Sequence, residues 1–99
     1  MQPDREGEQR AAQRFAVALP ITMEGEEGGF THELSAGGVL FEWSSPPEVG
    51  AHVSLSLEYE VDGVEFQVPC DGRVVRVERH GDNYNVAVRL RRPLFGEPD

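Results

Sequence analysis

The chain has 99 residues, and its nine basic side chains, all arginine, stand against eighteen Asp and Glu, which gives a formal net charge of −9. The length fits one domain, and such acidity argues against general binding to DNA or RNA backbones. The sequence has no apolar run long enough for a membrane-spanning helix and no apolar signal core in residues 1–9. We therefore expect a cytoplasmic protein without membrane insertion.

Apolar residues recur at every second position in several segments, which is typical of strands with one buried and one solvent-facing side. Turns rich in glycine, proline and aspartate separate these segments. Six or seven short antiparallel strands predict an all-β fold, either a small closed barrel or a tight sandwich. We expect a flexible lead-in at 1–13, a barrel at 14–92, a frayed tail at 93–99, and strands at 14–23, 30–34, 38–43, 52–60, 64–70, 72–79 and 84–91.

The phase of each strand predicts which side chains are buried. In the fifth expected strand, Val64, Phe66 and Cys70 fall on the apolar side and are expected in the core. If Val75 and the residue two positions later are also core residues, Arg76 faces outward.

The turns follow the same segmentation. Asp62-Gly63 stands between two alternating runs, which is a strong hairpin signal. The run from Met23 to Gly29 contains three glutamates and three glycines, and we expect a mobile acidic loop there. The three histidines and the single Cys70 lack the spacing of metal ligands, so we expect no metal site.

The arginines are unevenly distributed. Residues 24–71 contain eleven acids and no Arg, whereas residues 72–99 contain six Arg against four acids. If the apolar residues of 14–23 face inward, Arg14 faces outward at the start of that strand, and Arg10 can fold back beside it. Arginine suits phosphates and the O6/N7 edge of guanine, because its guanidinium donates two parallel hydrogen bonds.

Two short motifs stand in the first part of the chain. Residues 10–14 (RAAQR) form an RxxxR run that leads directly into the first expected strand, and residues 33–38 have the sequence ELSAGG. Together they resemble the PilZ domain family, which has RxxxR followed by [D/N]-x-S-x-x-G. The segments 72–77 and 84–90 are similar to its last two strands, so the resemblance covers about residues 10–91.

The resemblance implies a six-stranded antiparallel barrel that binds cyclic di-GMP, a bacterial second messenger. By position, Arg10 and Arg14 would be the principal ligand clamps, and Ser35 would offer a hydroxyl. Gly38 would permit close backbone approach. Glu33 stands where the family has Asp or Asn; its carboxylate keeps an acceptor for guanine N–H groups but moves it by about one C–C bond, roughly 1.5 Å.

Two functions remain open from the sequence. The first is a cyclic di-GMP sensor whose change is read by a downstream effector protein, with no other cofactor. The second is a degenerate adaptor of the same fold that binds a protein and no nucleotide. We expect no enzyme, because no Ser/His/Asp or Cys/His arrangement is recognisable.

Overall fold

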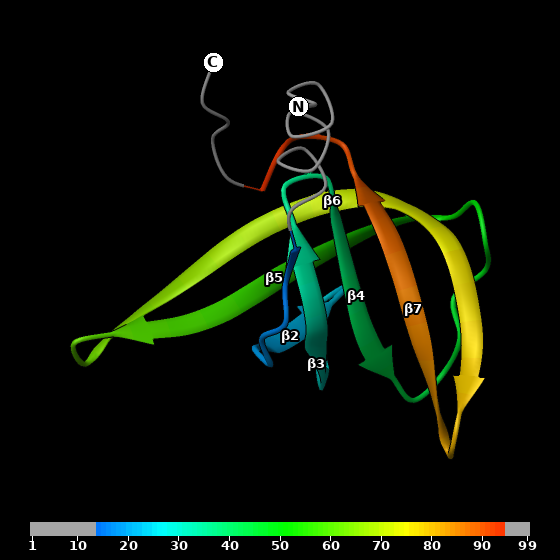
Figure 1. Cartoon of the computed structure of the whole chain (residues 1–99), viewed down its shortest axis with the longest axis horizontal. Coiled ribbons are helices and arrows are strands. Elements are labelled where there is room, and N and C mark those ends of the chain that lie inside the picture. Colours follow the sequence, from blue (N-terminus) through cyan, green and yellow to red (C-terminus); the bar gives the residue numbers. More distant parts are fainter. Residues whose placement is uncertain (1–13, 95–99) are drawn as a thin grey trace, which may run out of the picture.

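The computed structural model describes residues 14–94, and all the regular structure in this range is β-strand (Figure 1). The seven strands are β1 (Arg14–Phe15), β2 (Pro20–Met23), β3 (Glu26–Ser35), β4 (Gly38–Trp43), β5 (His52–Val61), β6 (Val64–His80) and β7 (Asn83–Leu90).

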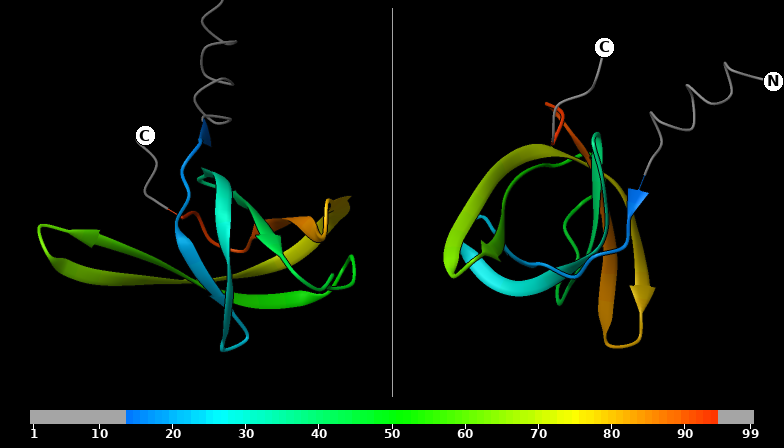
Figure 2. Two further views of the ribbon diagram at one scale, coloured as in Figure 1. Left: turned by 90° about the horizontal axis from the view of Figure 1, so that it is seen from below. Right: turned by 60° about the vertical axis from the view of Figure 1, so that its left-hand side comes forward.

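Six of the strands form a closed ring in which every pairing is antiparallel. Around the ring the order is β2, β3, β4, β7, β6 and β5, and β5 pairs with β2 to close it. The right-hand view of Figure 2 shows the strands curving around a common centre. The seventh strand, β1, pairs with the end of β3. The predicted small antiparallel barrel is therefore confirmed.

The expected single strand at 14–23 is instead two short strands, β1 and β2, which pair with opposite ends of β3. Thr31 lies on β3 between these two pairings and is fully buried. Its hydroxyl accepts a hydrogen bond from the N–H of Leu19 at 2.9 Å and donates one to the carbonyl of Val17. The N–H of Thr31 also donates to the carbonyl of Leu19 at 2.9 Å. This side chain thus satisfies backbone groups that the interrupted ladder leaves without a strand partner.

The two expected strands at 64–70 and 72–79 are instead one strand of 17 residues, β6. Its first half pairs with β5 and its second half with β7, and Gly72 belongs to both pairings. A Cβ atom at Gly72 would lie 2.2 Å from the carbonyl oxygen of Arg89, so only glycine fits there. The close approach lets β6 continue from one partner to the other and close the barrel.

The turns confirm one prediction and correct another. Asp62 and Gly63 join β5 to β6 with φ angles of 51° and 81°, as a tight hairpin with two left-handed residues requires. The expected loop from Met23 to Gly29 is instead a two-residue turn followed by the start of β3. The loop was predicted because glycine and glutamate have a weak preference for strands. Pairing with β2 overrides this preference.

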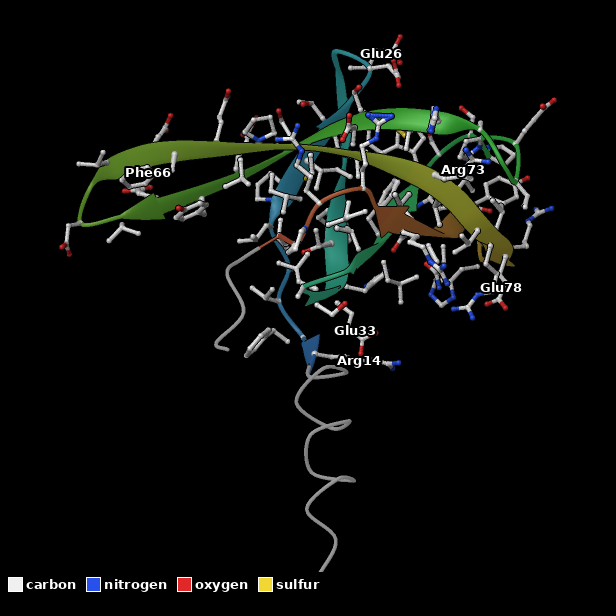
Figure 3. All side chains as sticks on the ribbon, turned by 90° about the horizontal axis from the view of Figure 1, so that it is seen from above. Arg14, Glu26, Glu33, Phe66, Arg73 and Glu78 are labelled. Carbon is white, nitrogen blue, oxygen red and sulfur yellow. The ribbon has the colours of Figure 1, made fainter. Side chains whose placement is uncertain are left out.

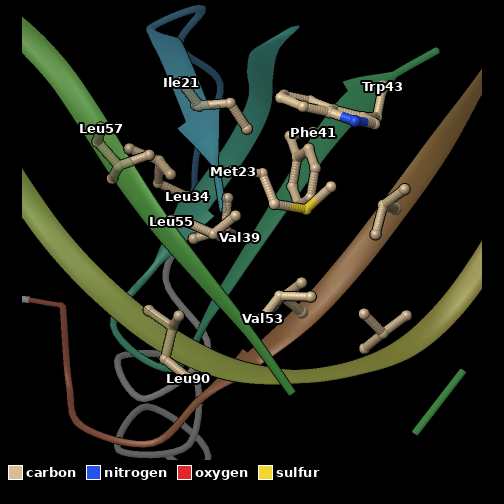
Figure 4. Packing of buried hydrophobic residues seen from close by; sticks show 13 residues of the cluster. Ile21, Met23, Leu34, Val39, Phe41, Trp43, Val53, Leu55, Leu57 and Leu90 are labelled. Carbon is tan, nitrogen blue, oxygen red and sulfur yellow. The ribbon is translucent and has the colours of Figure 1, made fainter. Parts of the chain in front are cut away.

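The core lies inside the ring, and all strands except β1 contribute to it (Figure 4). Phe41 is fully buried and meets the ring of Trp43 edge-on at a centroid distance of 6.0 Å. The buried cluster comprises Ile21, Met23, Leu34, Val39, Phe41, Trp43, Val53, Leu55, Leu57, Val74, Val86, Val88 and Leu90.

The end of the β5–β6 hairpin projects from the barrel, as Figures 1 and 2 show. Val64 and Phe66 lie in this projecting part and are 55% and 42% exposed, so the prediction that they are core residues is wrong. Cys70, closer to the barrel, is half-buried, and this burial raises the pKa of its thiol. The alternation of β6 is present in this part, but no further element of residues 14–94 covers its apolar side.

After β7 the chain turns back across the barrel. The N–H of Leu94 donates to the carbonyl of Ala36 at 2.6 Å, and the Leu94 side chain packs against the core. Residues 14–94 contain no helix that could span a membrane.

Candidate functional site

A cavity of about 300 Å³ lies on the outer surface of the barrel, over β1, β3, β4, β7 and β6. It brings together both sequence motifs and two arginines from the C-terminal part of the chain. The polar side chains and glycines that line it are Arg14, Glu33, Ser35, Gly37, Gly38, Arg76 and Arg89.

The pairing of β1 with β3 joins the two motifs. Arg14 is the register partner of Ser35, so the last residue of the first motif lies directly beside the serine of the second. The guanidinium Nη1 of Arg14 is 3.9 Å from the carboxylate Oε2 of Glu33 (Figure 3). Both side chains are solvent-accessible, so this ion pair contributes little to stability. Arg14 is therefore available to an incoming ligand.

Ser35 and Gly38 form the narrow base of the site. They are register partners where β3 turns into β4, and the Ser35 hydroxyl lies 3.4 Å from the Gly38 carbonyl oxygen. A Cβ atom at Gly38 would lie 3.2 Å from the carbonyl oxygen of Val88, which is tighter than nearly all real contacts. The absence of a side chain at Gly38 thus keeps the backbone of β4 close to β7 and open to the outer surface.

Two β-bulges direct charged side chains to this surface. On β3 the register shifts between Thr31 and Glu33, so that Thr31 faces the core and Glu33 faces outward. On β6 the register shifts between Val74 and Arg76. A regular strand would place residues 74 and 76 on the same side, but the bulge leaves Val74 buried and Arg76 exposed.

The outward direction of Arg76 was predicted correctly from strand phase, but part of the reason was wrong. Val75 was expected in the core, but it is 47% exposed, and the bulge is what turns Arg76 outward. Arg89 faces outward because its neighbours Val88 and Leu90 are buried, and it pairs in register with Gly38. The sequence interpretation did not include Arg76 and Arg89 in the site. The sequence does show an excess of arginine after residue 71. It does not show the strand register that brings Arg76 and Arg89 to the site.

The arrangement suits an anionic ligand with planar, hydrogen-bonding groups. Three guanidinium groups, from Arg14, Arg76 and Arg89, border one cavity, and each can donate paired hydrogen bonds to a phosphate or a guanine edge. The side chain of Arg76 also has an acidic neighbour, because its Nε is 3.6 Å from Oε2 of Glu78. Arg10, the other predicted clamp, lies outside the described residues.

A second polar cluster lies on the same outer surface. The Glu42 carboxylate accepts from the Asn83 amide at 2.7 Å and lies 3.0 Å from Nε2 of His32. The hydrogen bond from Asn83 is the main reason why the pKa of Glu42 is below its usual value. Within residues 14–94, no three His, Cys, Asp or Glu side chains group in a way that could hold a metal ion.

Comparisons with known proteins bear on the whole domain. The model of the PilZ domain family matches residues 8–94 of this chain. Among solved structures, the Bacillus subtilis inhibitor of motility (MotI/DgrA) is similar, with a TM-score of 0.70 and 15% sequence identity. The similarity covers 81% of this chain and 41% of that one, so this chain corresponds to less than half of that protein, and the likeness shows the fold alone. A search of curated proteins gives no match.

Proposed function

Because this chain belongs to the PilZ domain family, a family of cyclic di-GMP receptor and adaptor modules, we propose that it binds cyclic di-GMP at the cavity on the outer barrel surface. PilZ domains are binding modules rather than enzymes, so the proposed activity is recognition of the nucleotide. A downstream effector protein would then respond to the bound state.

The observation that carries the proposal is the register pairing of Arg14 with Ser35 beside Gly38. This pairing gathers an arginine fork, a hydroxyl and an open stretch of backbone at one place. Cyclic di-GMP contains two phosphates and two guanines, and arginine forks fit both groups. We assign Arg14 to a guanine edge or phosphate, with Arg10 as its partner from the same motif.

Arg76 and Arg89 add positive charge to the proposed site in a domain whose net charge is −9. At cell-like ionic strength the screening length is about 8 Å, so nearby arginines outweigh distant glutamates for a ligand in the cavity. We therefore assign these two residues to the phosphates of the ligand.

Glu33 takes the role of the Asp or Asn found at this position in the family. Its carboxylate is 3.9 Å from the guanidinium of Arg14, so the two side chains lie together at the site. On binding, the carboxylate would accept guanine N–H groups while Arg14 turns to the ligand. The longer side chain shifts the acceptor, and positioning errors of this size weaken binding in preorganised sites.

The test is a calorimetric titration of the full chain with cyclic di-GMP, with cyclic di-AMP as the control nucleotide. We expect binding of cyclic di-GMP and a loss of at least about tenfold in affinity in Arg14→Ala, because removing one member of a desolvated charged contact costs about 2–5 kcal/mol. The matched control is Arg92→Ala, which removes the same charge from a residue that lines a different cavity. Equal affinities of Arg14→Ala and the unaltered chain would refute the site assignment.

The second candidate function is an adaptor that binds a protein and no nucleotide. The observation that favours it is Glu33, which stands where the family has Asp or Asn and places a longer acid 3.9 Å from Arg14. Absence of cyclic di-GMP binding in both the unaltered chain and Glu33→Asp would refute nucleotide binding and leave the adaptor function as the proposal. Binding by Glu33→Asp alone would show that the longer acid has disabled an otherwise complete site.

A further inference from the structure

The projecting part of β5 has a strand edge that no other strand of residues 14–94 occupies. β5 pairs with β2 only at Leu55 to Leu57, whereas its pairing with β6 continues to Val61. β2 begins at Pro20, which has no N–H to donate and lies at the next register position, opposite Glu58. The edge of β5 therefore becomes free where β2 begins.

The direction of the backbone groups on this edge follows from Ser54. Its N–H donates to the Glu24 carboxylate at 2.8 Å, and its carbonyl accepts from the Glu24 N–H at 2.9 Å, so both groups point to the β2 side. Backbone groups alternate between the two edges of a strand. The N–H and carbonyl groups of Glu58 and Glu60 thus point to the β2 side, and those of Tyr59 point toward β6.

Because the groups of Leu57 also face β6, its pairing with Ile21 uses the Glu58 N–H and the Pro20 carbonyl. The groups left on the free edge are therefore the Glu58 carbonyl and both backbone groups of Glu60.

The two faces beside this edge differ in chemistry. On one face, Tyr59 stacks on Phe66 at a centroid distance of 5.2 Å, and the face continues to the paired residues Val61 and Val64. All four side chains are at least 38% exposed, and Figure 3 shows Phe66 on the hairpin away from the barrel.

The opposite face carries three acids, two on β5 and one on β6. Glu60 and Glu65 are register partners, and Glu58 lies two residues earlier on the same side of β5. Neither strand of the hairpin has a basic side chain in this part, because residues 24–71 contain no Arg or Lys. A cavity of about 310 Å³ lies along the edge and is bordered by Pro20, Glu58 and Tyr59 among others.

We propose that this free edge binds an extended segment of a partner protein as an additional strand. In that segment, apolar and basic side chains alternate. Its backbone would bond to the Glu58 carbonyl and to the N–H and carbonyl of Glu60. Its apolar residues would cover Tyr59 and Val61, and its Lys or Arg residues would lie against the acids. Charge complementarity selects this partner over a second copy of the chain, because edge-to-edge pairing of two copies would place rows of glutamate side by side. The inference does not depend on nucleotide binding.

The test uses a short synthetic peptide of alternating lysine and valine, added to the ¹⁵N-labelled full chain without nucleotide. We expect amide shift changes at residues 57–68 and little change on β4. A peptide of alternating glutamate and valine is the matched control and should not bind. Binding of the acidic peptide, shift changes centred elsewhere, or no binding of the basic peptide would each overturn the proposal.

A pair of variants tests the edge itself. Glu60→Pro and Glu60→Ala both remove the carboxylate, but only proline removes the N–H that points to the free edge. We expect Glu60→Pro to weaken binding of the basic peptide by up to about tenfold relative to Glu60→Ala, as loss of one backbone hydrogen bond implies. Equal affinity of the two variants would exclude strand addition at this edge.

Two further measurements keep the proposal testable if the proline variant does not fold. Phe66→Ser removes an exposed ring from the apolar face, and Val49→Ser is the matched control from an exposed loop. We expect only Phe66→Ser to weaken peptide binding. Sedimentation equilibrium of the chain alone tests whether a second copy binds at this surface instead. A dimer that Phe66→Ser abolishes would show that it does and would overturn the proposal.

Discussion

The barrel part and the projecting part of the β5–β6 hairpin share one alternating pattern but lie in opposite environments. Leu55 and Leu57 are 3% and 2% exposed, whereas Tyr59 and Phe66, on the same face of the hairpin, are 38% and 42% exposed. The difference begins where β2 stops covering the edge of β5. Alternation therefore determines which side chains share a face, and the neighbouring strands determine whether that face is buried.

The largest expected contrast comes from removing one ring from each region. Phe41→Ala empties a fully buried position in the barrel and should lower the free energy of unfolding by about 3–5 kcal/mol. Phe66→Ala removes a half-exposed ring whose main contact is Tyr59, and should cost about 1 kcal/mol or less. Urea denaturation of the two variants measures both values. Similar costs would mean that the projecting face is covered in solution.

Two glycines sharpen the comparison for different physical reasons. Gly72→Ala places a Cβ atom 2.2 Å from a carbonyl oxygen of β7, where neither backbone can easily move, and should cost about 3 kcal/mol. Gly63→Ala meets no atom within 4 Å but retains a left-handed φ of 81°, which should cost about 1 kcal/mol. Thermal unfolding followed by circular dichroism ranks the two variants. The reverse order would show that closure of the barrel tolerates displacement of β6.

A smaller effect is expected where β1 separates from β2 beside the candidate site. Thr31→Val preserves shape but removes the hydroxyl that bonds Leu19 and Val17, so about 1–3 kcal/mol should be lost. Thr22→Val, on a half-exposed strand position, is the control and should change stability little. Urea unfolding measures both variants. An unchanged stability in Thr31→Val would mean that water replaces the buried hydroxyl.

From the sequence, the candidate residues could be grouped where a motif is local but not where they depend on the pairing of distant strands. The serine-glycine turn and the RxxxR run are short patterns, so Arg14, Ser35 and Gly38 could be proposed together before their register was known. Arg76 and Arg89 belong to distant strands. Their place beside Arg14 depends on a bulge in β6 and on the pairing of Gly38 with Arg89.

The sequence by itself determined the all-β class, the hairpin at Asp62-Gly63 and the family motifs, because alternation and turn chemistry act between neighbouring residues. Only the tertiary structure decided that one strand of 17 residues serves two partners through Gly72. It also decided that the alternating face at Tyr59 and Phe66 lies outside the barrel. The physical reason is that burial and bulges depend on which strand lies alongside, and those partners are far away in the chain.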